Sequence, residues 1–596
     1  MMAYRCQVYP IGLQVAGVFQ EICLVGFESF PFFIGERGKR LFVWEHLPDN
    51  QPIRGMVLVC APLGYEYFST HRTLRHLAWR LASEGFATYR FDYSNNGDSE
   101  GDSVESTTLA SCVNSVLALA NDLKIHNPDI PFYLSGFGIG ASIAAIASEN
   151  LQLDGLILWE PKTHGRRYMR ELVALSGILA RGESVSNVAE AAGIFLNPDI
   201  KHELENFSID KLSPPLAKRV LLHCNQSSRL VEAYSDNLHA SNVAVTFALY
   251  EGYEGIVDVP TDTRVPNDAI DFQVEWLKSR VAQPAAPYTR LYSQGAQKLQ
   301  TESLVETCCQ FSEKLLFGVL AEPVQQSNSS TAVVFLNCGS EHHVGPHRIY
   351  TDFSRALAAG GISCFRFDIE GIGDSKACGN NADNYAYSPC ALEDIASSLQ
   401  FLQDSRGLDN FILAGICAGA YHAFKASAAL KSFRISRAVL INPLVFDWDE
   451  SESLKEHQRI SVSRERSRYR GLAFQPKYWL KLLYKPSIIF NVLSIYSQSL
   501  LARLGALFNS GQVFSKNRVR DDLDGLRARG TKVALFVSSG DPGREIFIEK
   551  AGAKARQAIA SGMVTVFPLE DSDHGLSKKE MRCKVFEKMR RFISLG

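Results

Sequence analysis

A cysteine between two glycines is the first residue whose setting suggests chemistry. Cys417 stands in the run Gly415-Ile416-Cys417-Ala418-Gly419, between an apolar segment (FILA) and a segment of helical composition (AYHAFKASAAL). A Gly-x-nucleophile-x-Gly turn between a strand and a helix exposes its central side chain, because the glycines let strand and helix approach closely. The helix N-terminus favours a thiolate, and the N–H of Ala418 is placed to stabilise an oxyanion. A buried, inert cysteine on an ordinary turn is the competing interpretation.

An acid and a histidine follow Cys417 in the chain order that this chemistry uses. Asp541 ends a strand-like segment (KVALFVSSGD), and His574 lies in the loop after the next one (MVTVFPLEDSDHG). His574 would deprotonate Cys417, and Asp541 would orient the imidazole. Asp571 and Asp573 are alternative acids, but they lie too near His574 in sequence to be preferred. A loop histidine with a purely structural role is the alternative for His574.

The loop after the first central strand of this half is expected to supply a second oxyanion donor. It reads CGSEHH over residues 338–343, and a backbone N–H near Ser340 is the predicted donor. His342 and His343 are not assigned to a metal, since no third ligand stands at a suitable spacing. We therefore expect no metal and no cofactor.

The segments around these residues recur earlier in the chain. Residues 90–99 (RFDYSNNGDS) match residues 366–375 (RFDIEGIGDS) at an offset of 276, and the dipeptide His71-Arg72 matches residues 347–348 at the same offset. Each copy alternates strand-like and helix-like segments, which is typical of a mostly parallel sheet flanked by helices. Two similar units inside one large sheet are the less favoured alternative, because each copy continues through a full further set of strands and helices.

The repeat predicts an α/β protein of two tandem domains, each with a helical cap insertion. We place a degenerate domain at residues 1–283, an alanine- and proline-rich linker at 284–290, and a catalytic domain at 291–596. A cap over the active site is expected at about residues 447–530, because a core connection needs only a handful of residues. Its apolar helices can line a pocket for an acyl chain or simply pack within the cap.

The first copy lacks all three triad side chains. Gly138 is the centre of its Gly-Phe-Gly-Ile-Gly turn, the strand at residues 220–228 ends without an acid, and Glu254 stands in place of His574. Ser135, at the end of the preceding strand, is a displaced nucleophile only in a minor alternative. We predict a catalytically inactive domain that docks on the second domain, shapes its substrate entrance or binds a partner.

Over nearly its whole length the chain resembles the α/β-hydrolase superfamily, and each half is similar to hydrolases associated with exosortase (PEP-CTERM) systems. The first half carries this resemblance in APLGYEYFSTHRTLRHLAWRLASEGFATYRFDYSNNGDSEGD and LILWEPKTHGRRYMREL, the second in a GPHR loop, RFDIEGIGDS and AGICAGAYH. The resemblance implies an α/β-hydrolase fold in each half and triad roles for Cys417, Asp541 and His574. The first half departs from the pattern at every triad position. The resemblance names no substrate.

Composition and charge limit the partners and the cellular compartment that we expect for this protein. Net charge is -2 over 596 residues, which gives no global attraction for nucleic acid or a membrane surface. No clean apolar run of membrane-spanning length and no signal peptide is evident, so we expect a cytoplasmic protein without stable membrane insertion. The 13 cysteines show no metal-type or disulfide-type spacing, which is consistent with a reducing compartment.

A cysteine nucleophile favours acyl transfer from a thioester, because the acyl group moves between bonds of similar energy. Polyhydroxyalkanoate synthases have a similar cysteine turn on this fold, whereas dienelactone hydrolases use cysteine for hydrolysis. Residues 455–485 hold nine basic and two acidic side chains, either a solvated helical face or a dock for an acyl carrier protein or coenzyme A. The candidate docking residues are Arg464, Arg466, Arg468 and Arg470. A simple ester, lactone or thioester hydrolase and a non-catalytic carrier-binding scaffold are the alternative functions.

Overall fold

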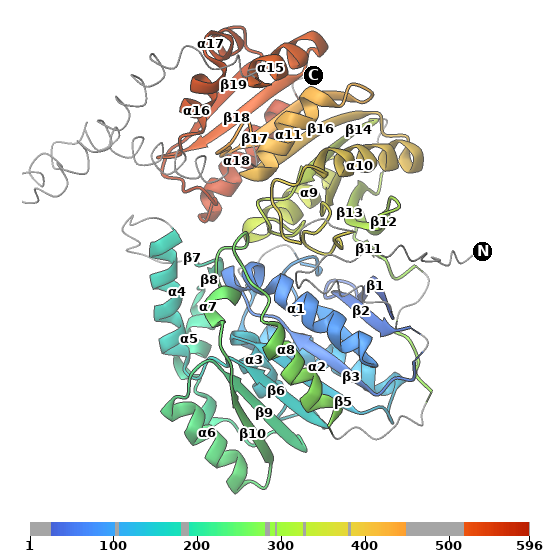
Figure 1. Cartoon of the computed structure of the whole chain (residues 1–596), viewed down its shortest axis with the longest axis vertical. Coiled ribbons are helices and arrows are strands. Elements are labelled where there is room, and N and C mark those ends of the chain that lie inside the picture. The colour runs from blue at the N-terminus through green and yellow to red at the C-terminus, as the bar shows by residue number, and fades with distance from the viewer. Residues whose placement is uncertain are drawn as a thin grey trace, which may run out of the picture.

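The computed structural model describes most of the chain in two stacked α/β domains (Figure 1). The described residues are 26–49, 51–101, 106–179, 190–279, 287–291, 295–325, 329–378, 383–448 and 518–594. Within them, no helix combines the length and hydropathy that a membrane span requires.

The first domain is built on an eight-stranded sheet in the order β1-β2-β4-β3-β5-β6-β9-β10. Its strands are β1 (Phe27–Ile34), β2 (Leu41–Pro48), β3 (Gly55–Cys60), β4 (Phe86–Phe91), β5 (Phe132–Phe137), β6 (Gly155–Trp159), β9 (Arg219–Cys224) and β10 (Ala244–Leu249). The pairs β1–β2 and β2–β4 are antiparallel, and all later pairs are parallel. Strands β3 to β6 are apolar and buried on both faces, as helices on both sides of a parallel sheet require.

Helices cover both faces of this sheet. Helices α1 (Tyr65–Ser83) and α8 (Asn267–Lys278) pack on one face, and α2 (Leu109–His126), α3 (Ile139–Ala147) and α6 (Arg229–Ala240) pack on the other. Between β6 and β9 the chain inserts α4 (Gly165–Leu179), a small hairpin of β7 (Glu190–Ala191) and β8 (Ile194–Phe195), and α5 (Pro198–Asn206). A one-turn helix, α7 (Tyr253–Ile256), follows β10.

The second domain repeats this plan on nine strands, in the order β11-β12-β13-β15-β14-β16-β17-β18-β19. They are β11 (Lys298–Gln300), β12 (Leu304–Phe311), β13 (Leu316–Pro323), β14 (Thr331–Leu336), β15 (Ser363–Phe367), β16 (Asn410–Ile416), β17 (Arg434–Ile441), β18 (Lys532–Ser538) and β19 (Val564–Leu569). From β13 onward the order matches that of the first sheet from β2 onward. The predicted fold class, two tandem α/β domains, is confirmed.

Helices again form two layers. Helices α9 (Ile349–Ala359) and α18 (Lys579–Ser594) pack on one face of the second sheet. The other face is covered by α10 (Ala391–Arg406), α11 (Ala418–Ala429), α15 (Arg518–Arg529), α16 (Gly543–Ala551) and α17 (Ala553–Ala560). The second sheet therefore lies between two layers of helices. The loops of the candidate active site follow the carboxyl ends of its parallel strands.

The predicted linker and cap are described only in part. In the linker, the Tyr288 hydroxyl donates to Glu45 at 2.7 Å, so its described end lies against the first domain. Residues 449–517, most of the predicted cap, lie outside the described residues. The last part of the predicted cap is described as helix α15, which buries Val519, Leu523 and Leu526 in the core of the second domain.

Candidate active site

Cys417 lies on a strained turn between β16 and α11. Its backbone has φ 55° and ψ -112°, a left-handed region that L-residues avoid unless the surrounding structure holds them there. A Cβ on Gly415 would lie 2.3 Å from the Gly419 carbonyl carbon, and one on Gly419 would lie 2.3 Å from the Leu336 carbonyl oxygen. Only glycine permits these approaches, which keep strand and helix close enough for a turn that leaves the Cys417 thiol partly accessible.

Two further loops bring an acid and a histidine to this turn. Asp541 follows β18, and its Oδ2 lies 2.9 Å from Nδ1 of His574, in the loop after β19. The side chain of Asp541 is 3 % exposed, so the carboxylate is held away from water. The backbone of His574 is fixed from the end of β17, because Asn442 Nδ2 donates to its carbonyl oxygen at 2.8 Å.

The imidazole also lies near Cys417, whose charge acts on its pKa. Burial lowers the pKa of His574, but the charges of Asp541 and Cys417, and hydrogen bonds to both, outweigh that effect and raise the pKa to about 10. The ring is therefore an imidazolium at neutral pH, although it is 23 % exposed. An imidazolium in this place can give its proton to a leaving group.

The loop over residues 338–343 lies beside the turn, and we refer to it as the oxyanion loop. Ser340 is 9 % exposed and its hydroxyl donates to the Asn384 carbonyl oxygen at 3.1 Å. The Glu341 N–H donates to the Cys338 carbonyl oxygen at 3.1 Å, so it is not free to bind a substrate oxygen. The Ser340 N–H donates to no acceptor among the described residues, and Ala418 opens helix α11. These two N–H groups stay the predicted oxyanion donors.

Glu341 is a residue of this loop that the sequence reasoning missed. Burial raises the pKa of its carboxyl group to about 8, against the opposing charge of His574. The residue keeps partial solvent access, but its Oε2 is buried and has no hydrogen-bond partner within the described residues. A protonated carboxyl group near His574 can donate a hydrogen bond to a neighbouring acceptor. Its position directly after Ser340, in the loop predicted to supply an oxyanion donor, is the feature of the sequence that could have identified it.

The first domain keeps the backbone of the turn without its chemistry. Gly138 has φ 59° and ψ -127°, close to the values at Cys417. A Cβ on Gly138 would lie 3.0 Å from Glu66 Oε2, and Glu66 Oε1 pairs with Lys162 Nζ at 2.9 Å. An ion pair therefore stands where a nucleophile would project. Ser135 lies inside β5 and is 1 % exposed, so it is not on the turn.

The alternative acids have structural contacts. The Asp573 carboxylate accepts the N–H of Ser577 at 2.8 Å, and the Asp571 carbonyl oxygen accepts from Lys578 Nζ at 3.1 Å. Glu254 lies in the first turn of α7 and supplies no imidazole. The candidate docking residues Arg464, Arg466, Arg468 and Arg470 lie outside the described residues.

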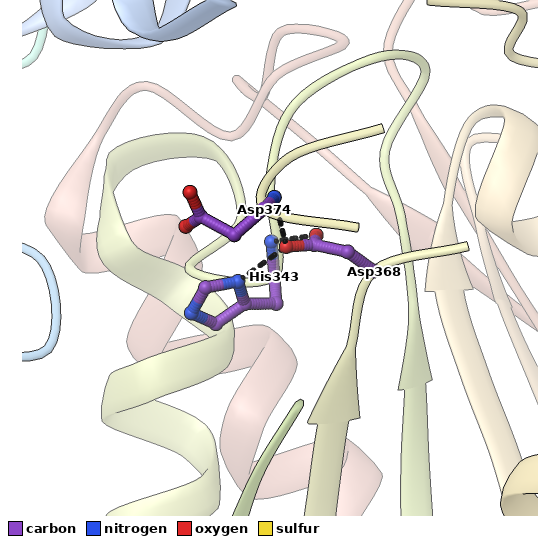
Figure 2. Close-up of side chains that lie close together, drawn as sticks. All are labelled: His343, Asp368 and Asp374. Carbon is purple, nitrogen blue, oxygen red and sulfur yellow. Dashed lines mark hydrogen bonds and ion pairs between the residues drawn. The ribbon is translucent and has the colours of Figure 1, made fainter. Parts of the chain in front are cut away.

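His343, Asp368 and Asp374 lie close enough together to hold a metal ion, and Figure 2 shows His343 pointing at Asp368. Both ring nitrogens of His343 already face carboxylates, Asp368 Oδ2 at 2.7 Å and Asp98 Oδ2 at 2.6 Å. Asp374 pairs with Arg90 Nη2 at 2.6 Å. The donors of this group are thus engaged with one another and with a guanidinium, which fits an ion-pair network better than a cation site.

Two protein-family models match this chain, one in each of the two domains. A family model described as "Serine aminopeptidase, S33" matches residues 51–205, and one described as "Alpha/beta hydrolase family" matches residues 333–578. No curated protein matches the chain.

Solved structures similar to the chain include a thermostable esterase from Pseudomonas putida, with 16% identity, 44% of this chain and 86% of that chain covered, and a TM-score of 0.30. Another is a putative dienelactone hydrolase from Klebsiella pneumoniae, with 16% identity, coverage of 43% and 100%, and a TM-score of 0.29. A third is an α/β serine hydrolase without lid from Xanthomonas campestris, with 19% identity, coverage of 44% and 97%, and a TM-score of 0.29. From the two family models and the shared strand order, the chain is a tandem of two α/β-hydrolase domains.

Proposed function

We propose that the second domain is an acyl-transfer enzyme that takes an acyl group from a thioester through an acyl-Cys417 intermediate. The observation that carries the proposal is the thiol on the strained turn, beside an imidazole whose Nδ1 lies 2.9 Å from Asp541 Oδ2. Nucleophile, base and orienting acid in this relation are what covalent acyl transfer needs. The resemblance to exosortase-associated hydrolases is consistent with a role in a biosynthetic pathway.

The proposed reaction has two halves. The Cys417 thiolate attacks the carbonyl carbon, and the resulting oxyanion accepts hydrogen bonds from the N–H groups of Ala418 and Ser340. The intermediate collapses with loss of the carrier thiolate, which takes the proton of the His574 imidazolium. In the second half, neutral His574 removes a proton from the acceptor, an amine, an alcohol or water, which attacks the acyl-cysteine. Cys417 leaves as the thiolate, and His574 is again the imidazolium.

A thioester donor is favoured over an oxygen ester because the first half then exchanges one thioester for another. Carriers that present such thioesters include coenzyme A and acyl carrier proteins. Hydrolysis of a simple ester by the same residues is the second candidate, and the match to hydrolase family models favours it. The two candidates differ in the acyl donor, a thioester or an oxygen ester, and in the acceptor, which is water alone in the second candidate.

Intact mass spectrometry of the full chain tests the intermediate. Incubation with short- and long-chain acyl-CoA and N-acetylcysteamine thioesters should add the mass of one acyl group, and Cys417→Ala should abolish the adduct. Cys583→Ala is the matched control, because Cys583 is an exposed thiol near the start of helix α18 that should not change acyl loading.

Two outcomes would contradict the assignment. An adduct that survives Cys417→Ala, or that disappears in Cys583→Ala, would place the acyl group on another thiol. Product analysis with and without an added amine or alcohol separates the two candidates. Acyl acceptor in the product supports transfer, whereas free acid alone in every mixture supports hydrolysis.

A further inference from the structure

The two domains meet through the same repeated segment on each side. Arg366 Nη2 contacts Asp98 Oδ1 at 2.8 Å, and Arg90 Nη2 contacts Asp374 Oδ1 at 2.6 Å. Arg90 and Arg366 are counterparts in the repeat, as are Asp98 and Asp374. The exchange is thus isologous, like the interface of a symmetric dimer, and both aspartates are at most 4 % exposed.

One of these contacts continues to the oxyanion loop. Asp98 Oδ2 lies 2.6 Å from Nε2 of His343, the last residue of that loop. The other carboxylate on this ring, Asp368, accepts the His343 N–H at 2.6 Å and the Asn337 side-chain amide at 2.8 Å. A carboxylate of the first domain therefore anchors a network that holds both ends of the oxyanion loop.

A second contact reaches the loop that carries His574. Glu190, in strand β7 of the first domain, pairs with Arg582 Nη2 in α18 at 2.9 Å, and the two side chains are 11% and 9% exposed. Nη1 of Arg582 donates to the carbonyl oxygens of Leu576 at 3.0 Å and Ser577 at 2.6 Å. These carbonyl groups follow His574 by two and three residues, so Glu190 orients the guanidinium that holds the histidine loop.

The hairpin that carries Glu190 packs directly beside this loop. A Cβ on Gly193, between β7 and β8, would lie 3.0 Å from Nδ1 of His347. Nε2 of the same imidazole lies 4.0 Å from the Cβ position of Gly575, the residue after His574. Burial lowers the pKa of His347 to about 3, so it is a neutral spacer between the first-domain hairpin and the histidine loop.

We propose that the first domain acts as a built-in positioning subunit for the second. Asp98 anchors the oxyanion loop through His343, and Glu190 anchors the His574 loop through Arg582. Both are positioning residues, since each acts through another side chain and neither touches the reacting atoms. This inference rests on the proposed function of Cys417, His574 and Asp541, and it explains why a domain without a triad is retained.

The first test measures the pair of Cys417 and His574 without any substrate. In full-length protein, the rate of Cys417 alkylation by iodoacetamide is followed against pH by peptide mass spectrometry. Glu190→Gln should lower the rate at pH 7 by about tenfold and move the profile to higher pH, because a displaced imidazolium stabilises the thiolate less. Glu171→Gln is the matched control, a half-exposed glutamate of the same first-domain insertion that pairs with Arg167.

The second test separates the two anchors. Asp98→Asn should leave the alkylation profile unchanged and lower kcat for acyl-thioester turnover by about tenfold with little change in KM, because oxyanion donors act mainly in the transition state. A Glu190→Gln alkylation profile that coincides with those of wild type and Glu171→Gln would overturn the proposal. If wild type forms no acyl adduct while Glu190→Gln still shifts the profile, the proposed function fails and the positioning role stands.

Discussion

The carboxyl group of Glu341 lies near His574 and keeps its proton to about pH 8, whereas an ordinary glutamate loses it near 4.5. The folded chain therefore binds more protons than the unfolded chain between these two pH values, and this group destabilises the fold increasingly as pH rises through that window. Glu341→Gln removes this pH-dependent destabilisation, because the amide is neutral at every pH. We expect the Tm of the variant to rise relative to the Tm of wild type as the pH increases from 5 to 8.

Thermal melts at several pH values check this residue-scale prediction. Glu313→Gln is the control, since Glu313 lies on an exposed turn between β12 and β13. Parallel Tm curves for Glu341→Gln and Glu313→Gln across this range would show that the Glu341 carboxyl group is ionised at neutral pH.

At the scale of elements, the turn at Cys417 depends on its glycines. Gly415→Ala would place a Cβ 2.3 Å from the Gly419 carbonyl carbon, and both sides of that contact are backbone. Strand β16 and helix α11 must then separate, at a cost of about 2–4 kcal/mol. We expect a lower calorimetric Tm and slower Cys417 alkylation. Gly177→Ala, in α4 where the new Cβ meets nothing within 4 Å, should leave alkylation unchanged and keep or slightly raise the Tm, since alanine favours a helix more than glycine does; equal effects of the two variants would contradict the steric argument.

Much of the arrangement of elements could be predicted, because it follows from patterns within one domain or from the repeat of those patterns. The match of residues 90–99 to 366–375 predicts two copies of one fold, and the chain order of Cys417, Asp541 and His574 predicts three loops at one edge of a sheet. The contacts between the domains could not be predicted in this way. His343 and Asp98 are 245 residues apart, and no periodicity of either segment specifies their pairing.

At the scale of the whole molecule, the domains are joined by charge as well as by apolar contact. Trp44 and Phe317 pack at 4.8 Å between ring centroids beside the buried pairs. Asp98 and Asp368 raise the pKa of His343 well above its ordinary value despite the opposing effect of burial, so its cation adds to those of the arginines. Removing one partner from such a buried set leaves an uncompensated charge, which costs more than the pair itself contributes.

The last prediction tests this cost of leaving a buried charge without its partner. Arg90→Gln leaves Asp374, 4 % exposed, beside the His71 imidazole at 3.4 Å, whose pKa burial lowers, and should destabilise the chain by about 3–5 kcal/mol. Arg80→Gln removes an arginine that is 34 % exposed and pairs within the first domain, so it should cost under about 1 kcal/mol. Calorimetry of the full chain measures both. Because Arg90 lies across the domain interface, its loss should also separate the melting of the two domains, whereas a Tm shift no larger than that of Arg80→Gln would mean that the buried ion pairs do not couple them.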